Sequence, residues 1–258
     1  MFSNSIKFLE KIGKFTLNHL GEFGKISIFA GNAVKGCFTP PFYPKMIWRQ
    51  IIQIGYFSLP VVGLTAIFSG AVLALQSYSG FSRFNAESAI ATVVILSITR
   101  ELGPVLAGLM VAGRVGASIA AEIGTMKVTE QLDALRTLST NPFRYLVAPR
   151  VIASVLSLPL LVLIADIIGV MGGYLVSVHS LGFSPGPYIS SSFKFLESID
   201  VISGLTKAAV FGFIIAIMGC YHSKGGAEGV GIATTNAVVS ASILILLTNY
   251  VITGLFFG

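Results

Sequence analysis

Residues 90–121 read IATVVILSITRELGPVLAGLMVAGRVGASIAA, and this stretch decides the fold class. It stays apolar for longer than the roughly 20 residues that a transmembrane helix needs. Only Arg100, Glu101 and Arg114 carry a charge within it. We therefore predict a membrane-crossing helix that holds ionisable side chains at membrane depth, where such groups usually face a cavity or a partner.

The composition of the whole chain agrees with this prediction. Of the 258 residues, 54% are hydrophobic and 11% are charged, and the mean hydropathy is +0.84. A soluble domain carries about 25% charged residues. The composition excludes a disordered, collagen-like, coiled-coil or disulfide-scaffold protein and indicates a polytopic membrane protein.

Four further apolar blocks are long enough to span a membrane. We predict an all-α membrane protein with five transmembrane helices. Pro60, Pro104 and Pro159 each lie inside a block and are expected kink points. The four further blocks are residues 51–78, 151–178, 201–221 and 236–257.

The N-terminal stretch is amphipathic rather than apolar. Between residues 5 and 36, basic and apolar side chains recur at helical spacing on different faces. This pattern predicts an amphipathic helix that lies in the membrane interface. The alternative is a helix packed on a soluble domain. The predicted organisation is an interfacial helix and linker over 1–46, followed by a five-span domain over 47–258.

The distribution of basic residues predicts the orientation. Seven lie in residues 1–50, four lie between the second and third blocks, and Lys224 lies between the fourth and fifth. The other side of the membrane has only Arg83 and Lys194. The positive-inside rule then puts the N-terminus in the cytoplasm and the C-terminus outside. We attribute the net charge of +6 to the basic residues that set the membrane orientation, and no nucleic-acid partner is expected.

Signatures of catalysis are missing. The sequence contains no G-x-x-x-x-G-K-[ST] phosphate loop, no H-E-x-x-H metal motif and no G-x-S-x-G elbow. We predict no catalytic residue, no metal and no cofactor.

Small residues recur every four positions in the second block. Gly108, Ala112, Gly116 and Ala120 form this ridge, and such spacing lets helix backbones approach closely. Two interpretations remain open: tight packing within one subunit, or a symmetric interface between two subunits.

The charges inside the apolar blocks suggest a specific pair. Glu101 and Lys207 lie in different blocks, and pairing would relieve the cost of both charges. Arg100 competes for a carboxylate but lies about 100° from Glu101 around the helix. We predict that Arg100, Glu101 and Lys207 form either a register-fixing ion pair or a polar element of a substrate cavity. Asp166 is expected to hydrogen-bond between helices or to lie near water.

The connection after the second block reads AEIGTMKVTEQLDAL, residues 121–135. A short amphipathic helix here is predicted either to enter a groove of a partner or to cap the bundle at the interface. Three acidic residues and one methionine of this helix would lie on one helical face, and three apolar residues would lie on another. The first set is Glu122, Met126, Glu130 and Asp133, and the second is Val128, Leu132 and Leu135.

Residues 121–135, together with residues 99–120, resemble the signature of the MlaE/YrbE permeases. These are the membrane subunits of MCE-type ABC lipid transporters. The length, the basic amphipathic N-terminus and the five-block layout fit the same family, so the resemblance covers essentially the whole chain.

The resemblance implies a homodimeric permease in the bacterial inner membrane that carries phospholipid or another hydrophobic lipid between the inner and outer membranes. It further implies a cytoplasmic ABC ATPase that binds the connection after the second span. An MCE-domain protein on the periplasmic side and a small STAS-like subunit are further implied partners. The rival readings of the residues are a self-contained ion-coupled carrier or channel, and a membrane scaffold.

Overall fold

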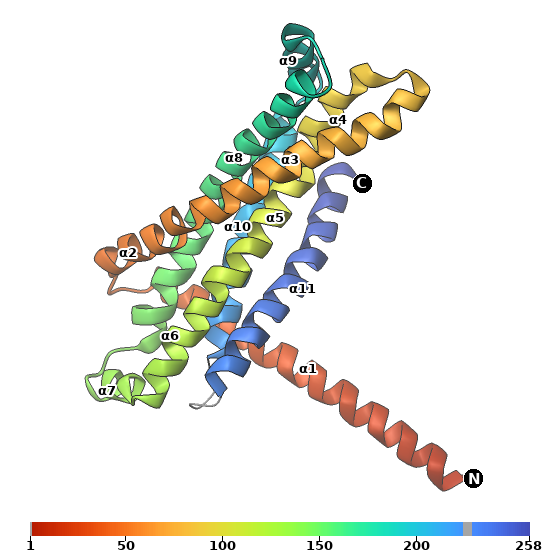
Figure 1. Cartoon of the computed structure of the whole chain (residues 1–258). Helices are drawn as coiled ribbons and strands as arrows, with labels where there is room; N and C mark the ends of the chain where they lie inside the picture. The colour runs from red at the N-terminus through yellow and green to blue at the C-terminus, as the bar shows by residue number, and fades with distance from the viewer. Residues whose placement is uncertain (1, 224–228) are drawn as a thin grey trace.

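The computed structural model describes residues 2–223 and 229–258 as a bundle of long helices with one helix projecting from it (Figure 1). The described residues contain no β-strand. Five helical stretches are long and apolar enough to cross a membrane, which confirms the predicted all-α, five-span class. In chain order these spans are Pro44–Phe84, Glu87–Val128, Phe143–His179, Ser198–His222 and Gly229–Phe257.

The spans are built from the following helices. The first contains α2 (Pro44–Ile54) and α3 (Leu59–Phe81), and the second contains α4 (Ile90–Ser97), α5 (Gly103–Val111) and α6 (Ala117–Val128). The third contains α8 (Ala148–His179), the fourth is α10 (Ser198–His222) and the fifth is α11 (Gly229–Phe257). Shorter helices α7 (Gln131–Thr137) and α9 (Pro185–Lys194) lie between spans. Lys224 lies outside the described residues.

The described residues contain three π-helical turns. η4 (Ile98–Leu102) and η5 (Ala112–Gly116) interrupt the second span, and η6 (Phe143–Val147) begins the third. Each contains one arginine, and each arginine bonds a group on another part of the chain. Isolated π-turns inside α-helices are often found at functional sites, and sequence periodicity does not reveal them.

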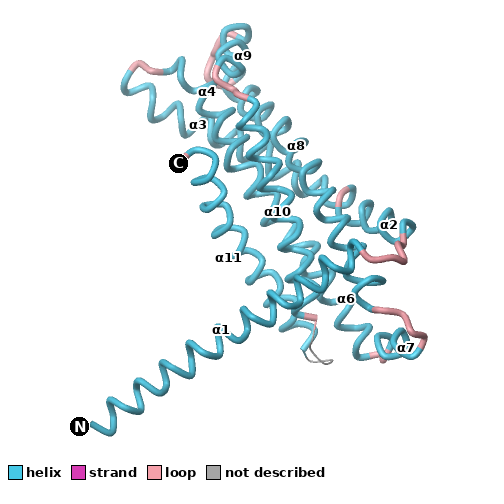
Figure 2. The backbone as a smooth tube through the Cα atoms, turned by 180° about the vertical axis from the view of Figure 1, so that it is seen from behind, coloured by secondary structure: helices cyan, strands magenta, loops and turns pink. Residues whose placement is uncertain are grey.

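The first and third spans pack backbone against backbone. A Cβ added at Gly70 would collide with the Gly169 carbonyl, and one at Gly172 would collide with the Ile67 carbonyl. Glycine at these positions removes the side chain that would hold α3 and α8 apart, as in close-packed membrane helices. Figure 2 shows the two helices running side by side.

The predicted ridge of small residues faces the inside of the same chain. Gly108 lies against Phe211 of α10 and Ile245 of α11, and Gly116 lies against Ile215. Ala112 and Ala120 are fully buried. Of the two interpretations, these positions therefore fit packing within one subunit.

The N-terminal stretch forms a single helix, α1 (Phe2–Phe38), whose first half projects away from the bundle (Figures 1 and 2). Its second half is attached to the third and fourth spans. The Phe29 ring lies 5.2 Å from the Phe143 ring and 5.6 Å from the Tyr221 ring. The Tyr221 hydroxyl donates to Glu22 at 2.9 Å.

Candidate functional site

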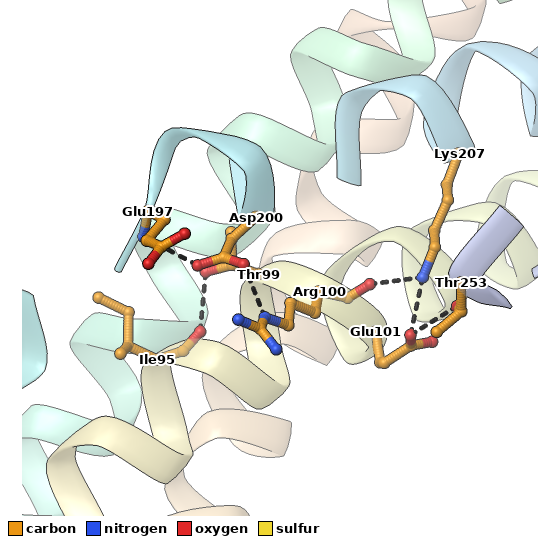
Figure 3. Close-up of polar contacts among 8 residues, drawn as sticks. All are labelled: Ile95, Thr99, Arg100, Glu101, Glu197, Asp200, Lys207 and Thr253. Carbon is orange, nitrogen blue, oxygen red and sulfur yellow. Dashed lines mark hydrogen bonds and ion pairs between the residues drawn. The ribbon is translucent and has the colours of Figure 1, made fainter. Parts of the chain in front are cut away.

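The predicted pair between Glu101 and Lys207 is confirmed. The Lys207 ammonium on α10 lies 2.8 Å from Glu101 Oε1 on η4 (Figure 3). Lys207 has no exposed surface, so its charge depends on protein partners. Its ammonium also donates to the Arg100 carbonyl at 2.8 Å.

Pro104 explains why the Arg100 carbonyl is available to Lys207. In a regular α-helix the N–H of residue 104 would donate to the carbonyl of residue 100, but proline has no N–H. The π-turn η4 ends immediately before Gly103 and Pro104. The sequence Arg100-Glu101-Leu102-Gly103-Pro104 thus supplies to the same ammonium both a carboxylate and a carbonyl that lacks its regular α-helical donor.

Glu101 also joins the fifth span to this site. Thr253 donates its hydroxyl to Glu101 Oε1 at 2.8 Å, and Asn249 donates its amide to Oε2 at 2.7 Å. One carboxylate therefore accepts three donors from two other helices, which compensates much of the cost of placing it in a membrane. Asn249 and Thr253 could not be predicted from the sequence, because polar uncharged residues are common in apolar helices.

Arg100 forms a separate ion pair that the sequence analysis also missed. Its Nε donates to Asp200 Oδ1 at 2.7 Å, and its guanidinium lies 4.4 Å from the centre of the Phe257 ring. The other Asp200 oxygen accepts the Glu197 N–H at 2.9 Å, which closes a capping box at the start of α10. The three-residue spacing of Glu197 and Asp200 before an apolar run is the sequence signal that could have indicated this capping box.

In each of the two ion pairs, one side chain is buried and the other is partly exposed. Lys207 and Asp200 are fully buried, whereas the side chains of Arg100 and Glu101 are 35% and 38% exposed. A recess of about 320 Å³ lies along the end of α11, and Thr253 and Phe257 contribute to both the recess and the site. The arrangement offers an accessible cation and hydrogen-bonding groups to a molecule within the membrane.

Of the two expectations for Asp166, a hydrogen bond between helices or a position near water, the first does not hold for its Oδ1 atom. Its Oδ1 is buried and has no hydrogen-bond partner among the described residues. A Cβ at Gly103 would collide with this oxygen, so glycine makes room for the carboxyl group between α8 and α5. Asp166 also borders an apolar cavity of about 350 Å³ between α4, α8 and α9.

The connection after the second span differs from the predicted single amphipathic helix. α6 ends at Val128, and α7 begins at Gln131. Glu130 between them has φ of 58°, a left-handed conformation that breaks the helix. The prediction that Glu122, Met126, Glu130 and Asp133 share one helical face is therefore wrong.

The individual side chains of this connection also point to different environments. Glu122 pairs at 2.8 Å with Arg150, whose side chain is 3% exposed. This carboxylate therefore compensates a buried charge inside the bundle. Leu132 packs against the core of the bundle, and Leu135 is half-buried. Met126 is half-buried, and Val128 is exposed. Glu130 and Asp133 are exposed, and Asp133 pairs with the neighbouring Arg136 at 3.3 Å.

Comparison with known proteins decides the family. Residues 47–255 match the family described as Permease MlaE. The chain belongs to the MlaE permease family. A "Probable ABC transporter permease protein" of Rickettsia bellii is 63% identical to this permease over 255 residues, which cover 98% of each chain. It is also 34% identical over 257 residues, again 98% of each chain, to the "Intermembrane phospholipid transport system permease protein MlaE" of Haemophilus influenzae.

A plant protein also belongs among the relatives of this permease. The chloroplastic "Protein TRIGALACTOSYLDIACYLGLYCEROL 1" of Arabidopsis thaliana is 37% identical over 235 residues, which cover 90% of this chain and 67% of the plant chain. The family match and the five spans make the chain a multi-pass membrane protein and the permease, non-catalytic subunit of an ABC transporter. The resemblance seen in the sequence is confirmed.

Proposed function

We propose that this permease moves phospholipid or another hydrophobic lipid between the inner and outer membranes of a bacterium. The observation that carries the proposal is the half-open ion-pair site of Arg100, Glu101 and Lys207 within the spans. A phospholipid headgroup requires charged and hydrogen-bonding partners at membrane depth, and this site provides both. The name of the Haemophilus influenzae relative, which describes intermembrane phospholipid transport, supports the same substrate class.

The energy would come from a separate cytoplasmic ATPase. Membership of an ABC transporter family supports such a partner, and the sequence contains no phosphate loop of its own. We place the contact at the connection from Glu122 to Leu135, where the exposed carboxylates of Glu130 and Asp133 are available to basic groups. Because the helix breaks at Glu130, the contacting element is the α6–α7 corner rather than one continuous helix.

A homodimer would complete the lipid pathway. The face of α11 that turns away from the bundle is strongly apolar, and Ile243, Leu247 and Tyr250 are 60%, 59% and 82% exposed. The half-exposed Arg100 and Glu101 lie beside the same helix. A second copy packed on this face would enclose the recess at the end of α11, so that Arg100 and Glu101 would face an enclosed lipid pathway rather than the surrounding bilayer.

The remaining partners follow from the proposed orientation. With the N-terminus in the cytoplasm of a bacterial inner membrane, α7 lies on the cytoplasmic side, and α9 and the C-terminus lie on the periplasmic side. The periplasmic end would then contact an MCE-domain protein. A STAS-like subunit would act through the ATPase.

Purification of the permease in mild detergent tests this function. The proposal expects an ABC ATPase and an MCE-domain protein to co-purify, and lipid extraction with mass spectrometry to recover bound phospholipid. Purified permease that transports an ion on its own, with no ATPase and no bound lipid, would support the carrier reading and contradict the proposal.

A further inference from the structure

A polar recess elsewhere in the chain shares no residue with the ion-pair site. The backbone segments that form it lie at the end of the bundle that carries α7 (Figure 1). It has a volume of about 360 Å³ and forms where the end of α1 meets the start of the third span. Its polar lining comes from Asn32, Lys35, Thr39, Asn141 and Arg144.

The backbone brings these side chains together. A Cβ at Gly36 would lie 3.4 Å from the Phe143 carbonyl, so glycine lets α1 approach η6 closely. Arg144 donates to the Pro40 carbonyl at 2.6 Å, which holds its guanidinium beside the end of α1. A guanidinium has five N–H donors, so this single bond leaves donors for a ligand.

The charged side chains that line the recess are all basic. Lys35 and Arg144 both line it, and no carboxylate does. Neither cation forms an ion pair among the described residues. The Phe143 N–H is already taken by the Asn141 side chain at 2.9 Å, so side-chain donors would have to hold a ligand. The recess therefore suits a compact anion with several acceptor oxygens.

Exposed aromatic side chains place the recess at the level of lipid headgroups. Phe38 and Phe42 are 80% and 58% exposed on the segment that leaves the recess, and Trp48 is 65% exposed shortly after it. Aromatic residues, tryptophan above all, collect at the membrane–water interface. A phosphate group held by Lys35 and Arg144 would thus lie where the surrounding leaflet carries its own phosphates.

We propose that this recess binds the phosphate of an anionic phospholipid from the surrounding leaflet. The bound lipid fixes α1 against the third span through Lys35 on one side and Arg144 on the other. This lipid is distinct from any transported molecule, because the recess and the ion-pair site share no residue.

Native mass spectrometry of the delipidated protein, titrated with phosphatidylglycerol or phosphatidylcholine in detergent, tests the proposal. We expect phosphatidylglycerol to bind more tightly than phosphatidylcholine. Lys35→Gln should weaken phosphatidylglycerol binding about fivefold, since it removes one of the two cations that line the recess. Lys35→Glu should weaken it further.

Lys45→Glu is the matched control, because Lys45 is exposed on the following helix and does not line the recess. It should bind phosphatidylglycerol as the wild type does. Equal binding by wild type and Lys35→Glu, or equal binding of the two lipids, would overturn the proposal. Excess inorganic phosphate separates the two sources of the ligand. Retained phosphatidylglycerol supports the lipid, whereas full displacement would make free phosphate the ligand and overturn the lipid assignment.

Discussion

The ammonium of Lys207 lies 2.8 Å from a carboxylate oxygen of Glu101 and 2.8 Å from the carbonyl of Arg100. Both partners come from the π-turn η4, and Pro104 removes the N–H that would bond that carbonyl in a regular α-helix. The buried charge of the fourth span is therefore compensated by one short segment of the second span.

The Glu101–Lys207 pair should show strong coupling in a double-mutant cycle. Glu101→Ala leaves the fully buried Lys207 without its counter-ion, and breaking a buried pair costs about 3–5 kcal/mol. The double variant with Lys207→Ala should be less damaged than Glu101→Ala alone. Thermal unfolding in detergent and lipid transport are the measurements. Additive effects would contradict the coupling, and the exposed pair Asp133–Arg136 is a control expected to contribute at most about 1 kcal/mol.

Gly70→Ala should destabilise the bundle. The added Cβ would collide with the Gly169 carbonyl, so α3 and α8 must move apart, and overpacking of this kind costs about 1–3 kcal/mol. The melting temperature of the purified protein measures the effect. Gly113→Ala is the control, because a Cβ there meets nothing within 4 Å. Equal melting temperatures for the two variants would refute the backbone contact.

Reversal of charge at the α6–α7 corner should release the ATPase without unfolding the permease. Glu130→Lys combined with Asp133→Lys changes two exposed carboxylates, so the folded state should lose little stability. Co-purification of the ATPase and melting temperature are measured together. Glu87→Lys, an exposed change near the opposite end of the second span, should leave assembly intact. Normal ATPase co-purification by the double variant would show that this corner is not the contact.

Cysteine labelling should establish the orientation. In a background of Cys37→Ser and Cys220→Ala, Lys14→Cys and Lys127→Cys should react with a membrane-impermeant reagent only from the cytoplasmic side. Lys194→Cys on α9 should react only from the periplasmic side, since α9 and α7 lie at opposite ends of the bundle (Figure 1). The reverse pattern would invert the topology that the basic residues predict.

Much of the fold could be predicted from the sequence because long apolar stretches identify membrane spans. The five spans and the helix of α1 follow from that signal and from the charge pattern of the N-terminus. The pair of Glu101 and Lys207 could be predicted as well. Few opposite charges lie in the spans, and each needs a partner.

The remainder of the site depends on local backbone geometry. The π-turns rotate Arg100 and Glu101 away from the directions that a regular helix gives, so the pairing of Arg100 with Asp200 did not follow from periodicity. The break at Glu130 was missed because neither glycine nor proline marks it. Residues 122–135 share helical faces only if the helix is continuous, and it ends at Val128.

The glycine contacts between α3 and α8 limit how the permease can change shape. The two backbones touch without an intervening layer of side chains, so we expect the first and third spans to move together. The fifth span meets its neighbours through side chains instead: Ile245 packs against Gly108, and Asn249 and Thr253 bond Glu101. We therefore expect a conformational cycle in this chain to keep α3 and α8 together and to move α11 relative to them.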